Sequence, residues 1–428
     1  MLKHLFCISS IFVLLSTSVL ADQLDVSVLA ESAILINAET GRVLFEKQSH
    51  QLQYPASTTK IATALYALKK KKDGLNELIL AEQDSIASIT DEQMRRSNYS
   101  LPAYWLTPGG THIGIKKGEQ LALKDLLYGM MIASGNDAAN VIAQHVSGSI
   151  PNFMSELNTY LRSIGCSKTN FLNPHGLFHP QHQTTALDLA TMTREAMKDP
   201  MFRQIVSTVR YTRPKTNKQD PTTLVQSNRL LRQGDFFYPH AIGVKTGYLS
   251  LAQNTLVAAA EKDGRTLIAV LLKTKERPDS FRDAIRLFEA AYAEKSIQRL
   301  LLKKGPQQFT VAISGGARPL ETYLKDDLVL EYYPAEMIQT KSFLYWDQLQ
   351  LPISKDQRVG ELRIQDEAGQ VVAAGVLYAN AEVDQSFGTR LKALFRGSRG
   401  HIAPIWKVLA VLGVIGLMFL LFLRIRTR

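Results

Sequence analysis

Cysteine is nearly absent from the chain, and this excludes two kinds of architecture. Only Cys7 and Cys166 occur among 428 residues, and Cys7 lies in a segment that we expect to be removed. One mature chain therefore holds neither a disulfide framework nor a metal site built from cysteines. This composition is compatible with an oxidising compartment.

Basic clusters interleaved with aromatic side chains are also lacking, although the formal net charge is +11 and the pI is about 9.4. Proteins that bind nucleic acids typically present such clusters, so nucleic acid is not an expected partner. An anionic envelope or lipid surface fits the charge better. The lysines at 69–72 close a predicted helix, where cations offset the helix dipole.

Long apolar runs occur only near the two ends of the chain. A short basic start, an apolar stretch and small residues up to Ala21 are typical of a secretory signal peptide, predicted as 1–21. An apolar run over 408–423 precedes three arginines. We expect 404–428 to span the membrane and end in a short cytoplasmic tail. The protein is thus expected at the cytoplasmic membrane, with its main domains on the periplasmic, extracytoplasmic side.

Apolar spacing predicts strands at both ends of a mainly helical middle. The predicted strands are 32–36, 43–45, 242–248, 255–260 and 266–272. The predicted helices are 57–68, 121–146, 153–164 and 281–293. One antiparallel sheet built from remote segments, with helices on both sides and a helical subdomain, explains this order. We therefore predict an α+β domain over 22–297.

The pattern changes beyond this domain. Short alternating runs such as 309–313 and 359–364 predict a small all-β domain over 298–388. A basic linker, 389–403, follows it and leads to the predicted membrane helix. Its cations are expected either to contact anionic lipid head groups or to remain solvated.

Three short motifs occur once each along the chain. They are Ser-x-x-Lys at Ser57 and Lys60, Ser-x-Asn at Ser134 and Asn136, and Lys-Thr-Gly at 245–247. A capped helix, a helix bend and a strand end would explain them singly. All three together would require three coincidences in this order, so a catalytic site is the better interpretation.

The first motif has the chemistry of an activated nucleophile. Pro55 favours a helix start, which places Ser57 in the first turn and Lys60 on the same face. Lysine can take a serine proton only when it is neutral, and burial and a second cation such as Lys245 favour that state. The Ser57 N–H, unpaired in a first turn, can stabilise an oxyanion.

The other two motifs have the chemistry of a peptide-binding groove. Gly135 is costly within a helix, so a bend is predicted that exposes Ser134 and Asn136 to a cleft. On a strand, Gly247 would let a peptide approach the backbone, while Lys245 and its neighbouring threonine meet a carboxylate.

With their flanking residues, these motifs resemble the low-molecular-mass penicillin-binding proteins, the D-alanyl-D-alanine carboxypeptidases. The stretches that carry the resemblance are 54–60, 126–138, 173–177, 184–190 and 243–248. The resemblance extends over nearly the whole chain, including the β domain. It implies a penicillin-binding-protein/β-lactamase-like fold for the first domain.

The resemblance also implies an activity, a serine-type removal of the terminal D-alanine from peptidoglycan stem peptides, without metal or cofactor. Ser57 would form the acyl-enzyme, Lys60 would act as general base, and Ser134 would pass a proton to the leaving amine. The implied substrate-binding residues are Asn136, Lys245, Thr246, Gly247 and Tyr248, the last through an N–H in the oxyanion hole. β-Lactam antibiotics are expected to acylate Ser57.

Two segments depart from the pattern of this family. The stretch 88–114 is longer and different from what the family leads us to expect, and 249–253 replaces its usual threonine and Ala-Gly pattern. Both lie where substrate preference would be set.

Other functions remain open from the sequence. His175, His179 and His182 suggest zinc, but no H-E-x-x-H helix accompanies them. A serine β-lactamase shares the three motifs, and Glu156 superficially matches its deacylating glutamate, with the wrong spacing. A DD-endopeptidase would use the same serine chemistry. A non-catalytic wall-binding or β-lactam-sensing protein is disfavoured by the intact motifs.

Overall fold

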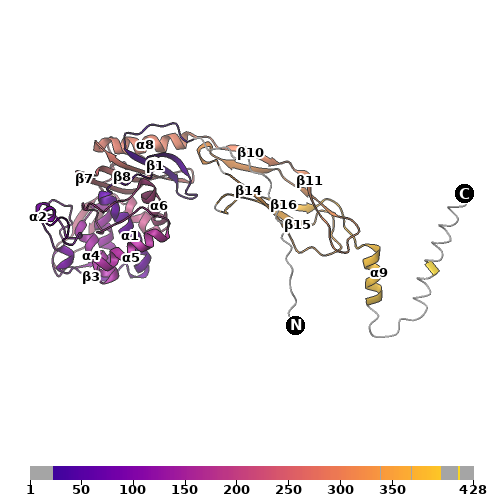
Figure 1. The fold of residues 1–428 in the computed structure, drawn as a ribbon, viewed down its shortest axis with the longest axis horizontal. Coiled ribbons are helices and arrows are strands. Elements are labelled where there is room, and N and C mark those ends of the chain that lie inside the picture. The colour runs from indigo at the N-terminus through magenta and orange to yellow at the C-terminus, as the bar shows by residue number, and fades with distance from the viewer. Residues whose placement is uncertain (1–22, 338, 368, 397–412, 415–428) are drawn as a thin grey trace. The chain divides into compact units, whose positions relative to one another are not determined.

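The computed structural model describes residues 23–337, 339–367, 369–396 and 413–414 (Figure 1). The predicted signal peptide, 1–21, lies outside these residues, and so does the predicted membrane anchor except for 413–414. Among the residues described, no helix combines the length and the apolar character needed to cross a bilayer. The described residues divide into two compact units, and the first boundary among them follows Ser296.

The first unit is built on a five-stranded sheet in the order β2-β1-β9-β8-β7, in which every neighbouring pair is antiparallel. Its strands are β1 (Ser32–Asn37), β2 (Val43–Lys47), β7 (Ala241–Leu249), β8 (Gln253–Lys262) and β9 (Arg265–Thr274). The two predicted N-terminal strands are confirmed and form an antiparallel hairpin, since Leu35 pairs with Phe45. The sheet joins residues from both ends of the unit, as the sequence predicted.

Alternate side chains of the central strands enter two separate cores. On β9, Ile268 and Val270 pack with one group of helices, while Ala269 and Leu271 pack under α8 (Arg277–Ala293) on the other face. Figure 1 shows α8 on one side of the sheet and α1 (Lys60–Lys71) on the other. This two-residue alternation gives the α+β architecture that was predicted.

Helices of the larger core surround α1. They are α3 (Leu123–Ile132), α4 (Asn136–Ser147), α5 (Ile150–Ser163), α6 (Ala186–Ala196) and α7 (Pro200–Ser207). The helix predicted over 121–146 is wrong in its continuity: the segment begins in strand β4 (Gln120–Ala122), and the chain leaves helical geometry at Ser134, where φ is +64°. Periodicity alone did not reveal this break because both pieces bury apolar residues on the same core. The bend predicted from Gly135 falls at this break and is confirmed.

Strands dominate the second unit. Two form one sheet, β10 (Ile297–Leu302) with β13 (Leu328–Tyr332). The five-stranded sheet has the order β11-β12-β16-β15-β14, with strands β11 (Gly305–Val311), β12 (Leu320–Leu324), β14 (Lys341–Trp346), β15 (Arg358–Gln365) and β16 (Val371–Ala379). A short helix, α9 (Phe387–Arg396), follows them. The sequence did not predict α9, which occupies the start of the expected basic linker.

Five residues from the β-rich stretch, Tyr333–Met337, group with the first unit. There Glu336 accepts hydrogen bonds from Arg265 Nε at 2.8 Å and from Asn37 Nδ2 at 2.9 Å. All three residues are buried. A buried guanidinium requires a carboxylate partner. The sequence did not predict this pair because Arg265 and Glu336 lie far apart in the chain.

Cys166 is a single, fully buried thiol in the first unit. Burial is the main reason that the pKa of this thiol is raised to about 12. It packs among apolar side chains as a small hydrophobic residue.

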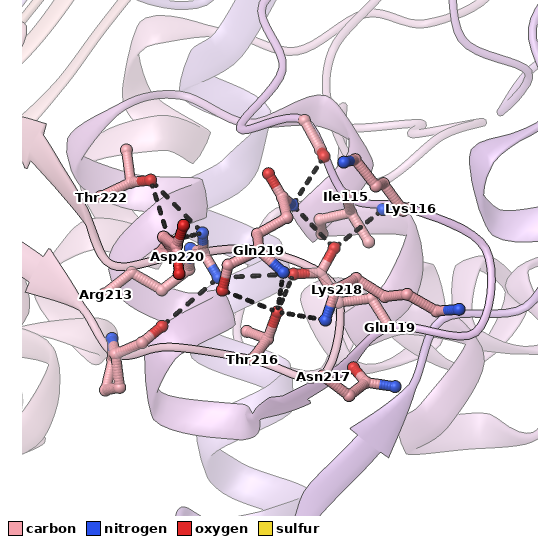
Figure 2. Close-up of polar contacts among 12 residues, drawn as sticks. Ile115, Lys116, Glu119, Arg213, Thr216, Asn217, Lys218, Gln219, Asp220 and Thr222 are labelled. Carbon is pink, nitrogen blue, oxygen red and sulfur yellow. Dashed lines mark hydrogen bonds and ion pairs between the residues drawn. The ribbon is translucent and has the colours of Figure 1, made fainter.

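A buried ion pair ties the hairpin of β5 (Arg210–Arg213) and β6 (Thr222–Val225) to the loop before β4 (Figure 2). Glu119 and Arg213 are 0% and 2% exposed, and the Arg213 Nη1 and Glu119 Oε1 atoms lie 3.3 Å apart. The same carboxylate accepts hydrogen bonds from Thr216 Oγ1 at 2.6 Å and from Gln219 Nε2 at 2.7 Å. Arg213 also donates to the Asp220 carbonyl at 3.0 Å. Both buried charges therefore have hydrogen-bond partners besides each other, as buried ions require.

We expect Glu119→Gln to lower the free energy of unfolding by about 3–5 kcal/mol, because Arg213 would keep its buried charge without an anion. Urea unfolding of the full-length protein, followed by far-ultraviolet circular dichroism, measures this change, since α1 to α8 all lie in the first unit. Lys198→Gln is the matched control. It breaks an exposed pair with Glu195 and is expected to cost at most about 1 kcal/mol. Equal losses in the two variants would contradict the prediction.

Candidate active site

The first two motif residues meet at the start of α1. Ser57 lies in a single turn of 3₁₀-helix, Ala56–Thr59, that leads directly into Lys60. The turn is tight: Ala56 has a φ of +49°, and Thr59 Oγ1 donates to its carbonyl at 2.9 Å. Lys60 Nζ lies 2.9 Å from Ser57 Oγ. The backbone thus brings the hydroxyl and the amine into contact at the spacing of three residues.

Lys60 is completely buried. Besides Ser57, its Nζ contacts Asn136 Oδ1 at 2.6 Å and the His175 carbonyl oxygen at 2.7 Å. Burial is the main cause that places the pKa of Lys60 well below its usual value, and the charge of Lys245 lowers this pKa further, while Asp137 opposes the shift. Two of the three contacts are to carbonyl oxygens, which only accept. A neutral amine satisfies both with its two hydrogens and directs its lone pair at Ser57.

The second motif lies at the break between α3 and α4. Ser134 adopts a left-handed backbone conformation, and its Oγ accepts a hydrogen bond from Lys245 Nζ at 3.0 Å. Asn136 begins α4 and lines the cleft, and its Nδ2 has no hydrogen bond within the described part of the chain. A left-handed serine is strained, and such strain is found where the surrounding structure holds a functional group in place.

The third motif runs along β7, at the edge of the sheet. Lys245 is buried, and burial, with a contribution from the Arg277 charge, lowers its pKa to about 7. Thr246 Oγ1 lies 2.9 Å from the Ser227 hydroxyl. Tyr248 is 65% exposed and borders the cleft.

Gly247 is required by the approach of β7 to the nucleophile. A Cβ at this position would lie 2.8 Å from the Ser57 backbone nitrogen and 2.5 Å from Thr255 Oγ1. The sequence interpretation assigned this glycine to substrate approach. The structure adds a second reason, because the bare backbone lets the strand pass next to the Ser57 N–H.

All three motifs border one cleft of about 660 Å³. This volume is in the range of sites that hold drug-sized ligands, about 300–1,000 Å³. The cleft lining includes the motif residues Ser57, Ser134, Asn136, Thr246, Gly247 and Tyr248. Lys60 and Lys245 lie behind this lining, each in contact with one of its hydroxyls.

Three functional contributions were missed by the sequence interpretation. Asp137 accepts hydrogen bonds from the N–H groups of Ile113 and Ile115, both at 3.0 Å, and so ties the loop before β4 to the second motif. Arg277 lines the cleft at the start of α8. The His175 carbonyl holds Lys60. Asp137 directly follows the motif, and His175 lies in the stretch 173–177 that carries the family resemblance, so both had a usable signal. Nothing in the local sequence marks Arg277.

The histidines that suggested zinc have structural partners. His182 Nδ1 accepts from the Leu172 N–H at 3.0 Å, so its Nε2 carries the proton and donates to Thr59 Oγ1 at 2.9 Å. Burial lowers the pKa of His182 to about 3 and the pKa of His175 well below its usual value. Within the described residues, no group of three or more His, Cys, Asp or Glu side chains is arranged to hold a metal ion.

Glu156 is not placed as a deacylating base would be. Its carboxylate accepts hydrogen bonds from Tyr66 at 2.8 Å and from Ser147 at 2.9 Å, and it is absent from the cleft lining. The β-lactamase interpretation thus loses its candidate deacylating residue.

The sequence profile of the family described as D-alanyl-D-alanine carboxypeptidase (Peptidase_S11) matches residues 17–276. The chain belongs to this family. D-alanyl-D-alanine carboxypeptidase DacF of Bacillus subtilis is 30% identical over 375 residues, which are 85% of this chain and 88% of DacF. DacD of Escherichia coli is 27% identical over 408 residues, 92% of this chain and 99% of DacD.

Solved structures agree with this assignment. Penicillin-binding protein 5 of Haemophilus influenzae has a TM-score of 0.57 at 24% identity, covering 84% of this chain and 98% of its own, and shows the shared fold. The D-alanyl-D-alanine carboxypeptidase of Mycobacterium tuberculosis has a TM-score of 0.53 at 28% identity, covering 63% of this chain and 93% of its own. The predicted family, a low-molecular-mass penicillin-binding protein with serine carboxypeptidase activity, is confirmed.

We expect kcat/KM for D-alanine release to fall as pH rises through about 7, because Lys245 then loses the proton with which it would hold a substrate carboxylate. Arg277→Gln removes a cation that lowers this pKa, so the alkaline limb should move to higher pH. The pH profile of kcat/KM, which reports on the free enzyme, measures the shift. Arg282→Gln removes an exposed cation of the same helix, outside the cleft lining. If the alkaline fall in kcat/KM stays at the same pH in Arg277→Gln, or shifts equally in both variants, the assignment of this pKa to Lys245 is wrong.

Proposed function

We propose that Ser57, Lys60 and Ser134 carry out the carboxypeptidase reaction on peptidoglycan stem peptides. The observation that carries this proposal is the buried amine of Lys60, 2.9 Å from the Ser57 hydroxyl and otherwise bonded to two carbonyl oxygens. A base held in this way is poised to take the serine proton and has no other proton to accept.

The first half of the reaction forms an ester. Ser57 Oγ bonds to the carbonyl carbon of the penultimate D-alanine while Lys60 takes its proton and the carbonyl electron pair moves onto oxygen. The N–H groups of Ser57 and Tyr248 stabilise that oxyanion. When it collapses, the C–N bond breaks, and the proton returns through Ser134 to the amine of the departing D-alanine.

The second half restores the serine. Water adds to the ester carbonyl with Lys60 as base, and the proton then returns to Ser57 Oγ as the C–O bond breaks. Through both halves, Asn136 Nδ2 holds a peptide carbonyl. Lys245 and Thr246 hold the terminal carboxylate, which a cation and a hydroxyl at one strand suit.

Replacement of Ser57 by Ala is expected to abolish covalent labelling by a fluorescent penicillin. Lys60→Arg is expected to slow labelling at least about 100-fold, because arginine stays protonated and cannot serve as base. In-gel fluorescence of the full-length protein measures both rates. Ser155→Ala, a change at an exposed serine outside the cleft lining, should label at the normal rate. Labelling that persists in Ser57→Ala would overturn the proposal.

We also propose a domain organisation and a location for the chain. Residues 1–21 are a signal peptide, 22–297 the peptidase domain, 298–388 a β-rich domain, 389–403 a basic linker and 404–428 a transmembrane anchor. Composition at both ends supports the targeting segments, and the division into compact units after Ser296 supports the first domain boundary. The catalytic domain would then lie on the periplasmic side of the cytoplasmic membrane.

Deletion of 404–428 is expected to release an active protein from the membrane, because the anchor contributes apolar burial in lipid and nothing to the cleft. Cell fractionation followed by penicillin labelling of the soluble and membrane fractions measures this. The full-length protein, fractionated in parallel, should remain with the membranes. A truncated protein that also remains there would place the anchor elsewhere.

A further inference from the structure

His182 is a buried histidine that has no role in the reaction proposed above. Its ring is 2% exposed and stacks on the Phe171 ring, with centroids 4.8 Å apart. Burial lowers its pKa to about 3, so the imidazole is neutral near pH 7. The Leu172 N–H donates to Nδ1 at 3.0 Å, which leaves the one ring proton on Nε2. The ring is therefore a fixed donor toward Thr59, whose Oγ1 lies 2.9 Å from Nε2.

Thr59 extends this hydrogen bond to the turn that carries the nucleophile. Its Oγ1 accepts from His182 and donates to the Ala56 carbonyl at 2.9 Å. Gly176 covers the same carbonyl, since a Cβ there would lie 1.9 Å from the Ala56 oxygen. The chain of hydrogen bonds from the Leu172 N–H through His182 and Thr59 to the Ala56 carbonyl, called the histidine relay below, thus runs through the protein interior.

The histidine relay ends on the peptide group that would stabilise the oxyanion. The Ala56 carbonyl and the Ser57 N–H belong to one planar peptide unit, which is trans, so the two groups point in opposite directions. Thr59 holds the carbonyl on the interior side. On the other side lies β7, where a Cβ at Gly247 would come within 2.8 Å of the Ser57 nitrogen. Because Ser57 and Gly247 both line the cleft, holding the carbonyl fixes the direction of the N–H.

A hydrogen bond to the carbonyl also strengthens the N–H of the same unit as a donor. Electron density moves toward the carbonyl oxygen, and successive hydrogen bonds in a low-dielectric interior polarise one another. The histidine relay has the same direction throughout, from donor to acceptor, so each bond adds to the next. Ala56 needs this support for a second reason, because its φ of +49° is strained for a residue with a Cβ.

We propose that His182 and Thr59 are positioning residues, which aim and polarise the Ser57 N–H of the oxyanion hole through the Ala56 carbonyl. The inference rests on the proposed function, which places the oxyanion at this N–H. Full negative charge develops on the substrate oxygen only as Ser57 attacks. An interaction that strengthens with that charge lowers the barrier to acylation more than it tightens substrate binding. The histidine relay should therefore act on kcat and not on KM.

The test breaks the histidine relay at two places and restores it with conservative variants. Thr59→Val keeps the shape of the side chain and loses the hydroxyl, whereas His182→Phe keeps a ring on Phe171 and loses the donor. Removal of an oxyanion donor costs about 100–1,000-fold in kcat, so loss of its support should lower kcat for D-alanine release about tenfold, with KM unchanged. Thr59→Ser and His182→Gln keep the hydroxyl and a donor, and should release D-alanine nearly as fast as the wild type.

Two further measurements distinguish this role from a merely structural one. Residues that act through one chain of hydrogen bonds do not add, so the double variant of Thr59→Val and His182→Phe should be as slow as the slower single variant. The infrared stretch of the acyl-enzyme ester, formed with a β-lactam isotopically labelled at its reactive carbonyl, should shift to higher frequency in Thr59→Val, because a weaker donor polarises the ester less. Thr193→Val is the matched control. It removes a buried hydroxyl that donates to the Leu189 carbonyl at 2.6 Å on α6, and should leave both readouts unchanged.

Effects that multiply in the double variant, a loss expressed in KM alone, or an unshifted ester stretch in Thr59→Val would each reject the histidine relay. If Thr59→Val does not fold, His182→Phe against His182→Gln makes the same comparison, since both lack Nδ1 and only the second keeps a donor. Penicillin labelling of the wild type separates this failure from failure of the proposed function. Labelling at Ser57 with unaffected variants rejects the relay alone. Absence of labelling at Ser57 rejects the catalytic assignment, and the relay with it.

Discussion

A positive charge at Lys60 is costly because the amine has no contact with water, and the reactivity of the site depends on this cost. Taking an ammonium out of water favours its neutral form, and the nearby Lys245 adds repulsion in the same direction. The neutral amine then finds two carbonyl oxygens and one hydroxyl around it. The same burial that would penalise a structural lysine here creates a base beside a serine.

This environment needs a rigid frame, and the frame comes from three remote parts of the chain. Gly247 lets β7 pass beside the Ser57 backbone, and Asp137 fastens the loop before β4 to the second motif. That loop is held in turn by the Glu119 and Arg213 pair. Buried ion pairs contribute little net stability, but they are expensive to break, so they keep a loop in one arrangement. The geometry at Ser57 thus depends on groups that never contact a substrate.

Local patterns were sufficient to predict what lies close in sequence. The contact of Ser57 with Lys60 follows from their spacing on one turn, and the central strands of the sheet follow from short apolar runs, which are buried on both faces. The contact of Lys60 with Asn136 and the approach of Arg277 to Lys245 depend on tertiary packing, which carries no local signal. The break at Ser134 does carry one, since Gly135 predicted a bend there. The same holds for Tyr333–Met337, whose buried carboxylate pairs with an arginine far earlier in the chain. The stretch 88–114 was recognisable from the sequence only as a departure from the family pattern. Its contacts with the catalytic elements, such as those of Thr111 and Tyr104 with α4, join residues that lie far apart in the chain.

The lone thiol of Cys166 has a consequence for maturation. In the folded protein it is sealed in the core with its pKa raised to about 12, so almost no thiolate exists to react with oxidants or with other thiols. An unfolded chain has no such protection. If the chain is exported as we propose, this thiol can form mixed disulfides only until the core of the first unit closes over it, so rapid core formation is its protection.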